Sequence, residues 1–285
     1  QIPVAERVGL ISLGKCCRRY LTDRSRHRIH DMSLGPVSLQ KGSSPGIPQH
    51  LRGQPRIVID TLCVDADIDM DSAATHVIDG VSWTVTTDTA TSAVAGSGGI
   101  RVVTSNSTLW VMTTEIPHYT ADDLLCVTVE FSLTTMGTNG QSIQVRLGQA
   151  ADGTSSTTED VTFTFRKTSS SAWRFRPGYY GSSSYSMSYV GDNPFSSSLP
   201  SRIVMQIIGH GNTWKAKFGT AAGRPRHNGL VAENNATARI CSRSAGTVAG
   251  ATPALCKYLR IVFGSNSGDL DVTVTGVEVT VSGNT

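Results

Sequence analysis

Four aspartates alternate with other residues in a short stretch of the chain, where their carboxylates could bind a metal ion. They are Asp65, Asp67, Asp69 and Asp71. Ca²⁺ prefers such hard oxygen ligands, but an EF-hand loop beginning at Asp65 would need Gly at position 70 and Glu at position 76. The sequence has Met70 and His76 there. The alternative is one acidic face of an extended strand, which could receive a basic segment of a neighbouring copy. We expect no metal and no cofactor, and Asp65, Asp67 and Asp69 are the candidate ligands should a metal bind.

A second cluster combines aromatic rings with guanidinium groups inside a Ser-rich stretch. It contains Trp173, Arg174, Tyr179, Tyr180 and Tyr185. Exposed rings on a β-sandwich can stack on sugars while Arg hydrogen-bonds the hydroxyls, and the same residue types are enriched at protein interfaces. In a strand, however, Trp173 and Phe175 would share one face, so both could belong to the core. The cluster is a candidate glycan-binding or interface site.

No set of residues predicts catalysis. The chain has 33 Ser and 32 Thr, so any apparent Ser-His-Asp arrangement would be a chance match. His210 lies in a Gly-rich turn without a partner at a fixed spacing, and the carboxylates show no close pairing of the kind a glycosidase uses. We therefore expect a protein that is not an enzyme.

Hydrophobic periodicity predicts that strands carry these residues. Within 123–134, Leu125, Val127, Val129, Phe131 and Leu133 alternate with mostly polar residues, which is typical of a half-buried strand. The same alternation recurs in 81–85, 143–147, 161–166 and 213–218, with turn sequences between the runs. The nearly continuous apolar runs 203–208 and 259–263 indicate central strands. About eleven strands and no convincing helix predict an all-β, antiparallel β-sandwich.

The last strand changes phase. Its apolar residues are even-numbered at Leu270, Val272 and Val274, then odd-numbered at Val277 and Val279. Because a one-residue shift moves side chains to the other face of a sheet, the pattern predicts a β-bulge or a crossing between sheets near Thr275-Gly276.

Charge divides the chain into two parts. Residues 1–57 contain ten Lys and Arg against three Asp and Glu, a net charge of +7, and the remainder carries −4. The first part also contains loop-forming Gly, Ser and Pro at 42–48 and lacks an amphipathic period, so it is expected to become ordered only against a partner. We predict a basic, extended N-terminal arm over 1–57 and a β-sandwich body over 58–285.

The six cysteines do not form a C-x-x-C pair, which argues against a zinc ribbon or a redox motif. Cys126 alternates with apolar residues and is expected to be a small buried thiol. Cys241 and Cys256 flank a Gly/Ala-rich segment and could form a disulfide. No apolar run approaches the roughly 18 residues of a membrane span, so no membrane partner is expected.

Several segments together resemble the jelly-roll sandwiches of the concanavalin A-like lectin and carbohydrate-binding module group. They are Asp79–Val85, Gly98–Val102, Leu124–Ser132, Ile143–Gly148 and the closing 268–281 strand. Domains of this texture are frequent in bacteriophage tail fibres, spikes and capsid decoration proteins. The resemblance covers roughly residues 76–282 and implies a structural virion protein, with a host glycan as a further ligand.

Three functions follow as expectations. The first is a virion subunit, of the capsid or tail, whose arm locks it to other copies of itself and to other virion proteins. The second is a carbohydrate-binding adhesion module. The third is a coat protein of a small icosahedral virus with a genome-facing arm, since an arm followed by a jelly roll is similar to those proteins. Among its arginines the arm contains large apolar residues, including Val8, Leu10, Ile11, Leu13, Leu21, Ile29, Met32, Leu34, Val37 and Leu39. We therefore expect it to lie on protein rather than on nucleic acid, with Arg18, Arg19, Arg24 and Arg26 contacting acidic groups.

Overall fold

The structure is a computed structural model. It describes residues 56–60, 64, 67–70, 74–90, 92–105, 108–120, 123–148, 160–169, 172–181, 184–187, 198–210, 213–219, 239–244, 256–265 and 268–283. Within these ranges the chain forms seventeen β-strands and no helix. The predicted arm therefore lies almost entirely outside the described residues.

The strands form two sheets in which all pairs are antiparallel. The strands of the nine-stranded sheet are β1 (Arg56–Asp60), β2 (Ile68–Asp69), β5 (Ser92–Gly96), β6 (Gly99–Thr104), β8 (Asp123–Met136), β13 (Arg202–His210), β14 (Thr213–Gly219), β15 (Arg239–Ser244) and β17 (Leu270–Gly283). Their order is β15-β14-β13-β8-β17-β6-β5-β2, with β1 paired to β17.

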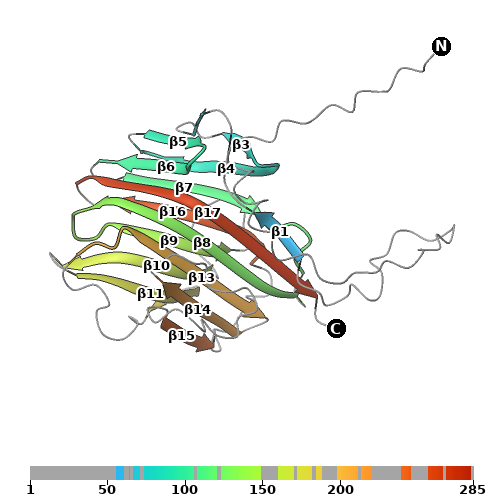
Figure 1. Cartoon of the computed structure of the whole chain (residues 1–285). Coiled ribbons are helices and arrows are strands. Elements are labelled where there is room, and N and C mark those ends of the chain that lie inside the picture. The colour runs from blue at the N-terminus through green and yellow to red at the C-terminus, as the bar shows by residue number, and fades with distance from the viewer. Residues whose placement is uncertain are drawn as a thin grey trace, which may run out of the picture.

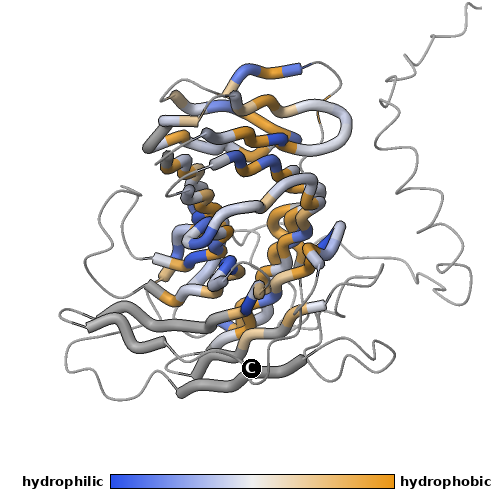
Figure 2. Tube along the Cα trace, turned by 90° about the vertical axis from the view of Figure 1, so that its left-hand side faces the viewer, coloured by the Kyte–Doolittle hydropathy of each residue, from blue (hydrophilic) through white to orange (hydrophobic). Residues whose placement is uncertain are grey.

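The second sheet has eight strands. They are β3 (Thr75–Ile78), β4 (Val81–Asp88), β7 (Thr108–Glu115), β9 (Ser142–Gly148), β10 (Asp160–Ser169), β11 (Ala172–Gly181), β12 (Ser184–Met187) and β16 (Tyr258–Ser265). Their order is β12-β11-β10-β9-β16-β7-β4-β3. In Figure 1 the nine-stranded sheet lies in front of the eight-stranded one, and Figure 2 shows the two layers from the side. The predicted all-β sandwich of jelly-roll type is confirmed.

Aromatic contacts join the two layers. Phe131 on β8 meets Phe263 on β16 edge to face, with ring centroids 6.1 Å apart. Farther along, Phe175 on β11 stacks on Phe218 of β14, with centroids 3.9 Å apart. All four rings are fully buried. Because aromatic side chains bury large areas, these pairs hold the sheets together at two separate places.

The predicted core face of β8 is confirmed, since Leu125, Val127, Val129, Phe131 and Leu133 are all buried. The expectation that the opposite face is solvated is wrong. Polar side chains at Thr128 and Glu130 are buried as well, as is Gln206 on the neighbouring β13. β8 is therefore a central strand covered on both sides.

The predicted bulge in β17 is also confirmed. Pairing between β17 and β8 shifts register between Val274 and Gly276, and both strands stay in the same sheet. The valines on either side of the shift, Val274 and Val277, are fully buried although their parity differs. The extra residue at the bulge thus keeps both halves of β17 facing one core.

The sandwich begins earlier in the sequence than the periodicity predicted. β1 pairs with the second half of β17, and Ile59 is buried in the core. The expected boundary between arm and body, after residue 57, therefore falls inside a strand. Cys126 is buried as expected, and Cys256 is buried as well. Neither forms a disulfide, so the possible bridge between Cys241 and Cys256 is not formed.

Candidate ligand-binding cavity

The structure corrects the interpretation of Trp173 as a ligand-binding ring. Only 6% of this residue is exposed, and it belongs to the core between the sheets. Its Nε1 donates a hydrogen bond to the carbonyl oxygen of Met136 at 3.3 Å, and the Lys167 ammonium lies 4.8 Å from the ring centroid. Trp173 therefore packs the sandwich and has no face left for a sugar.

The rest of that cluster lies on β11 and β12. Arg174 is half-buried and pairs in register with Arg166 of β10. Tyr180 pairs with Asp160 of β10 and with Tyr185 of β12, and Tyr179 pairs with Val161. The backbone thus brings the three tyrosines to one edge of the eight-stranded sheet. Their side chains lie outside the described part of the structure, so the predicted glycan or interface role of these tyrosines stays a prediction.

The four alternating aspartates do not form a metal site within the described part of the chain. Asp67 and Asp69 are exposed, and the short β2 that contains Asp69 pairs with β5. No group of three His, Cys, Asp or Glu side chains suited to a metal occurs among the described residues. Asp65 and Asp71, like Arg18, Arg19, Arg24 and Arg26 of the arm, lie outside them.

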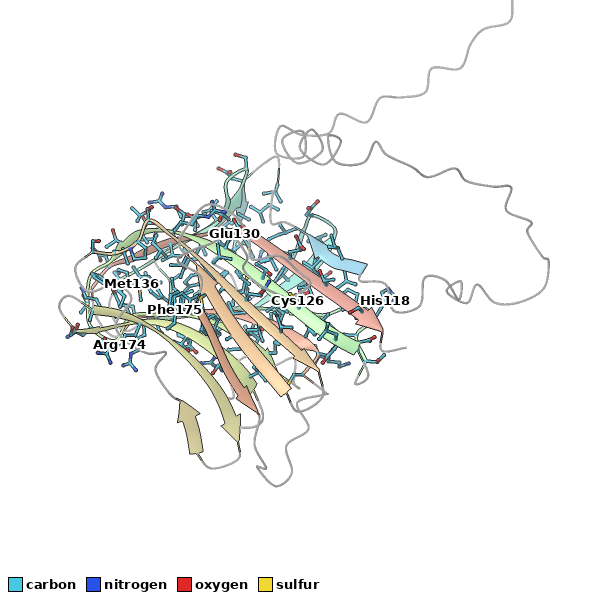
Figure 3. The ribbon with its side chains drawn as sticks, turned by 60° about the horizontal axis from the view of Figure 1, so that its bottom comes forward. His118, Cys126, Glu130, Met136, Arg174 and Phe175 are labelled. Carbon is cyan, nitrogen blue, oxygen red and sulfur yellow. The ribbon has the colours of Figure 1, made fainter. Side chains whose placement is uncertain are left out.

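Polar groups are buried on the face of the nine-stranded sheet that points away from the core. Glu130 on β8 accepts a salt bridge from Arg202 on β13, and Thr128 accepts a hydrogen bond from Gln206 Nε2 at 2.9 Å. Figure 3 labels Glu130 and Cys126, which lie on this face of β8 with Thr128 between them. The groups are paired across neighbouring strands, as buried polar groups must be to limit their desolvation cost. They stabilise the sheet rather than offering an open site.

A cavity of about 540 Å³ opens where β1 approaches the ends of β4, β7 and β16. It is lined by Val58, Gly80, Val81, Ser82, Thr84, Thr113, Thr114, Glu115, Pro117 and Tyr258. Strand pairing explains why these distant segments meet, since Thr84 lies opposite Thr113 and Glu115 lies opposite Tyr258. A volume in the range of roughly 300–1,000 Å³ is typical of pockets for small ligands.

The turns at the mouth of this cavity are fixed by local sequence. Asp79 and Gly80 both have positive φ, of 51° and 78°, in the two-residue connection between β3 and β4. Asp-Gly is the sequence such a type I′ hairpin favours. After β7, Pro117 precedes His118, which has φ 58° and lies at the end of the sandwich where β17 ends (Figure 3). Each turn contributes one residue to the cavity lining, Gly80 and Pro117.

Hydroxyl groups dominate the cavity lining. Thr84 Oγ1 lies 3.0 Å from Thr75 Oγ1, and Thr114 Oγ1 donates to the carbonyl oxygen of Glu115 at 3.4 Å. Thr113 differs from both, because only 4% of it is exposed and its Oγ1 has no hydrogen-bond partner among the described residues. A buried hydroxyl without a partner costs free energy, and a ligand hydroxyl entering the cavity could supply the missing bond.

Glu115 and Tyr258 add a carboxylate and a ring. Glu115 Oε1 accepts a hydrogen bond from Lys257 Nζ at 2.8 Å, and the Tyr258 ring is half-buried. Glu115 is the single carboxylate among the described residues that line the cavity. An ionised carboxylate accepts hydrogen bonds, so Glu115 can receive them from the hydroxyl groups of a ligand.

The sequence did not single out these residues. Tyr258 is the first residue of β16 and Glu115 is the last residue of β7, and both are ordinary residue types at the end of a strand. Only the pairing of β7 with β16 places Tyr258 opposite Glu115, although the two residues are far apart in the sequence. No local pattern reports a contact of that separation.

Among known proteins, the chain is similar in fold to several solved structures. No protein-family model matches the chain, and no curated protein sequence does. A protein of unknown function from Shewanella oneidensis MR-1 is 9% identical with a TM-score of 0.46, covering 86% of this chain and 97% of its own. Lectin II from Ulex europaeus is 7% identical with a TM-score of 0.43, covering 76% and 99%. The CBM2 module of the evolved Dit protein of Lactobacillus casei BL23 phage J-1 is 9% identical with a TM-score of 0.45, covering 82% and 99%.

The described residues contain no helix that is long and apolar enough to cross a bilayer.

Proposed function

We propose that the β-sandwich is a non-catalytic module that binds carbohydrate. The observation that carries this proposal is the cavity at the ends of β4, β7 and β16. It combines a half-buried Tyr ring, a carboxylate and several hydroxyl groups. Sugars present apolar C–H faces to aromatic rings, and their hydroxyls donate to carboxylates and exchange hydrogen bonds with Ser and Thr.

The test is direct binding of the full-length chain to a panel of oligosaccharides, comparing the wild type with Tyr258→Ala. We expect the wild type to bind at least one hydroxyl-rich oligosaccharide, and the variant to lose at least tenfold in affinity. Leu124→Ala is the matched control, because Leu124 is 40% exposed on β8 and does not line the cavity. Equal binding by wild type and Tyr258→Ala, or no binding to any member of the panel, would overturn the proposal.

A second proposal concerns where the module acts. The segregation of charge, +7 in residues 1–57 against −4 in the remainder, supports a role as a virion subunit held by its N-terminal arm. The apolar residues within the arm support attachment to protein surfaces of neighbouring subunits.

Attachment of the arm to protein resists moderate salt, whereas binding to the phosphates of a genome weakens steeply as the salt concentration rises. The measurement is release of the subunit from intact and from nuclease-treated empty particles across a salt series. Release at moderate salt, or loss with the genome, would favour a genome-binding coat protein instead.

A further inference from the structure

An ion pair borders the proposed carbohydrate cavity. Lys257 Nζ donates to Glu115 Oε1 at 2.8 Å, and both side chains are about half exposed, at 46% and 56%. The backbone fixes Lys257 at this place, because its carbonyl oxygen accepts a hydrogen bond from Ile116 N–H at 2.8 Å. The position of Lys257 next to the cavity is therefore set by the backbone and does not depend on the conformation of its side chain.

The same ammonium also lies near the aromatic ring of the cavity. Lys257 Nζ is 5.3 Å from the centroid of the Tyr258 ring, within the roughly 6 Å of a cation–π contact. Glu115 and Tyr258 are the two groups of the cavity that would attract a cationic ligand, and both already contact an ammonium. The hydrogen bond and charge of Glu115 raise the pKa of Lys257 above its ordinary value, so the ammonium stays protonated at neutral pH.

We infer that Lys257 sets the charge preference of the cavity: it excludes amine-bearing ligands and leaves a site for uncharged sugars. This inference rests on the proposed function and names the class of ligand. With Lys257 present, Glu115 and Lys257 together carry no net charge. The carboxylate keeps acceptor positions for sugar hydroxyls, because an ionised carboxylate offers about four lone-pair sites and Lys257 uses one oxygen.

Removing the lysine converts the same cavity into a cation site. In Lys257→Met the Glu115 carboxylate loses its ammonium partner and the Tyr258 ring loses its nearby cation. A protonated amine on a sugar can then occupy both, without repulsion from a like charge. Lys257→Arg keeps a permanent cation at the same position, so it retains the preference of the wild type.

The experiment titrates two matched probes into the full-length chain. The probes are a trimer of glucosamine, whose amines are protonated at pH 6, and the fully N-acetylated trimer of the same length. The variants are Lys257→Met and Lys257→Arg. The matched control is Arg101→Met, because Arg101 forms a salt bridge with Asp271 and neither residue lines the cavity. Thermal melting of each variant verifies folding.

We expect Lys257→Met to gain about tenfold in affinity for the glucosamine trimer relative to the acetylated trimer, and this gain to fall with added salt. Lys257→Arg and Arg101→Met should keep the wild-type ratio. An unchanged ratio in Lys257→Met would overturn the inference, as would a wild type that prefers acidic sugars and loses them in Lys257→Met. Failure of the wild type on the oligosaccharide panel would instead overturn the proposed function. The charge preference would then be tested by comparing the variants: binding of the glucosamine trimer by Lys257→Met and not by Lys257→Arg would support it, and binding by neither would overturn it.

Discussion

Gln206 on β13 donates a hydrogen bond to Thr128 on β8 at 2.9 Å, on the face of the nine-stranded sheet that points away from the hydrophobic core. Both residues are almost fully buried, at 0% and 1% exposure. A polar pair with so little exposure on the outward face shows that the middle of this sheet is covered on both sides. Buried polar side chains on this outward face therefore contribute to the stability of the fold, as the apolar side chains of the core do.

The first prediction concerns the two faces of β8. Phe131→Ala is expected to lower the free energy of unfolding by about 3–5 kcal/mol, because it removes a fully buried ring. Thr128→Ala should lower it by about 1–3 kcal/mol, because it leaves the buried Gln206 amide without this acceptor. Thr134→Ala is the control, since Thr134 lies on the same strand and is exposed. Urea unfolding measures all three. A Thr128 variant as stable as the Thr134 variant would contradict the role of the hydrogen bond.

The second prediction compares two neighbouring glycines. Gly99 has φ 109°, and a Cβ added there would lie 2.0 Å from the carbonyl oxygen of Val274. Gly99→Ala should therefore destabilise the protein by more than about 3 kcal/mol, beyond the range of ordinary substitutions. A Cβ on Gly98 would meet no atom within 4 Å, so Gly98→Ala should change the melting temperature little. Similar melting temperatures for the two variants would show that the backbone of β17 can move away at the bulge.

The third prediction concerns the boundary of the arm. Deletion of residues 1–55 should leave the melting temperature of the body unchanged, because it stops before β1. Deletion of residues 1–60 also removes Ile59 and the pairing of β1 with β17, and should cost several kcal/mol, as loss of a buried Ile does. Differential scanning calorimetry of both truncations checks this. Equal losses would mean that the arm itself stabilises the sandwich.

The fourth prediction concerns alkaline stability. Burial raises the pKa of Tyr119, and the nearby Cys256 and Asp123 raise it further. Since the unfolded chain releases this proton near pH 10 and the folded protein keeps it, stability should fall as pH rises above about 10. Tyr119→Phe removes that loss and leaves stability at pH 7 nearly unchanged, because the phenol has no hydrogen-bond partner among the described residues. Urea unfolding from pH 7 to pH 11 measures the difference. Parallel curves for wild type and variant would contradict it.

Patterns within single strands were sufficient to predict much of the fold. The alternation at Leu125–Leu133 identified the core face of β8, and the change of parity across Gly276 located the bulge in β17. Both features follow from side-chain periodicity along one strand, which the sequence records directly. The same reasoning could not show that Thr128 is buried, because its burial depends on what covers the other side of the sheet.

The candidate site could not be predicted in the same way. Trp173 looked suited to sugar binding because of its neighbours, yet the register of β11 turns it into the core. The sequence did not predict a role for Tyr258, because that role depends on its position opposite Glu115. The pairing of β7 with β16 brings the two residues together from distant parts of the sequence. The sequence shows which residues carry aromatic rings and carboxylates. Strand pairing determines which of these residues line the same cavity.

The position of β1 has a mechanical consequence. Among the described strands β1 pairs only with β17, and β17 pairs along its length with β8 in the middle of the nine-stranded sheet. In a subunit held by its N-terminal segment, tension would enter the molecule at Arg56 and pass from β1 into β17. The first structure to bear that load would be the ladder between the five-residue β1 and β17, so this short ladder would act as the link between the anchored segment and the interior of the sandwich.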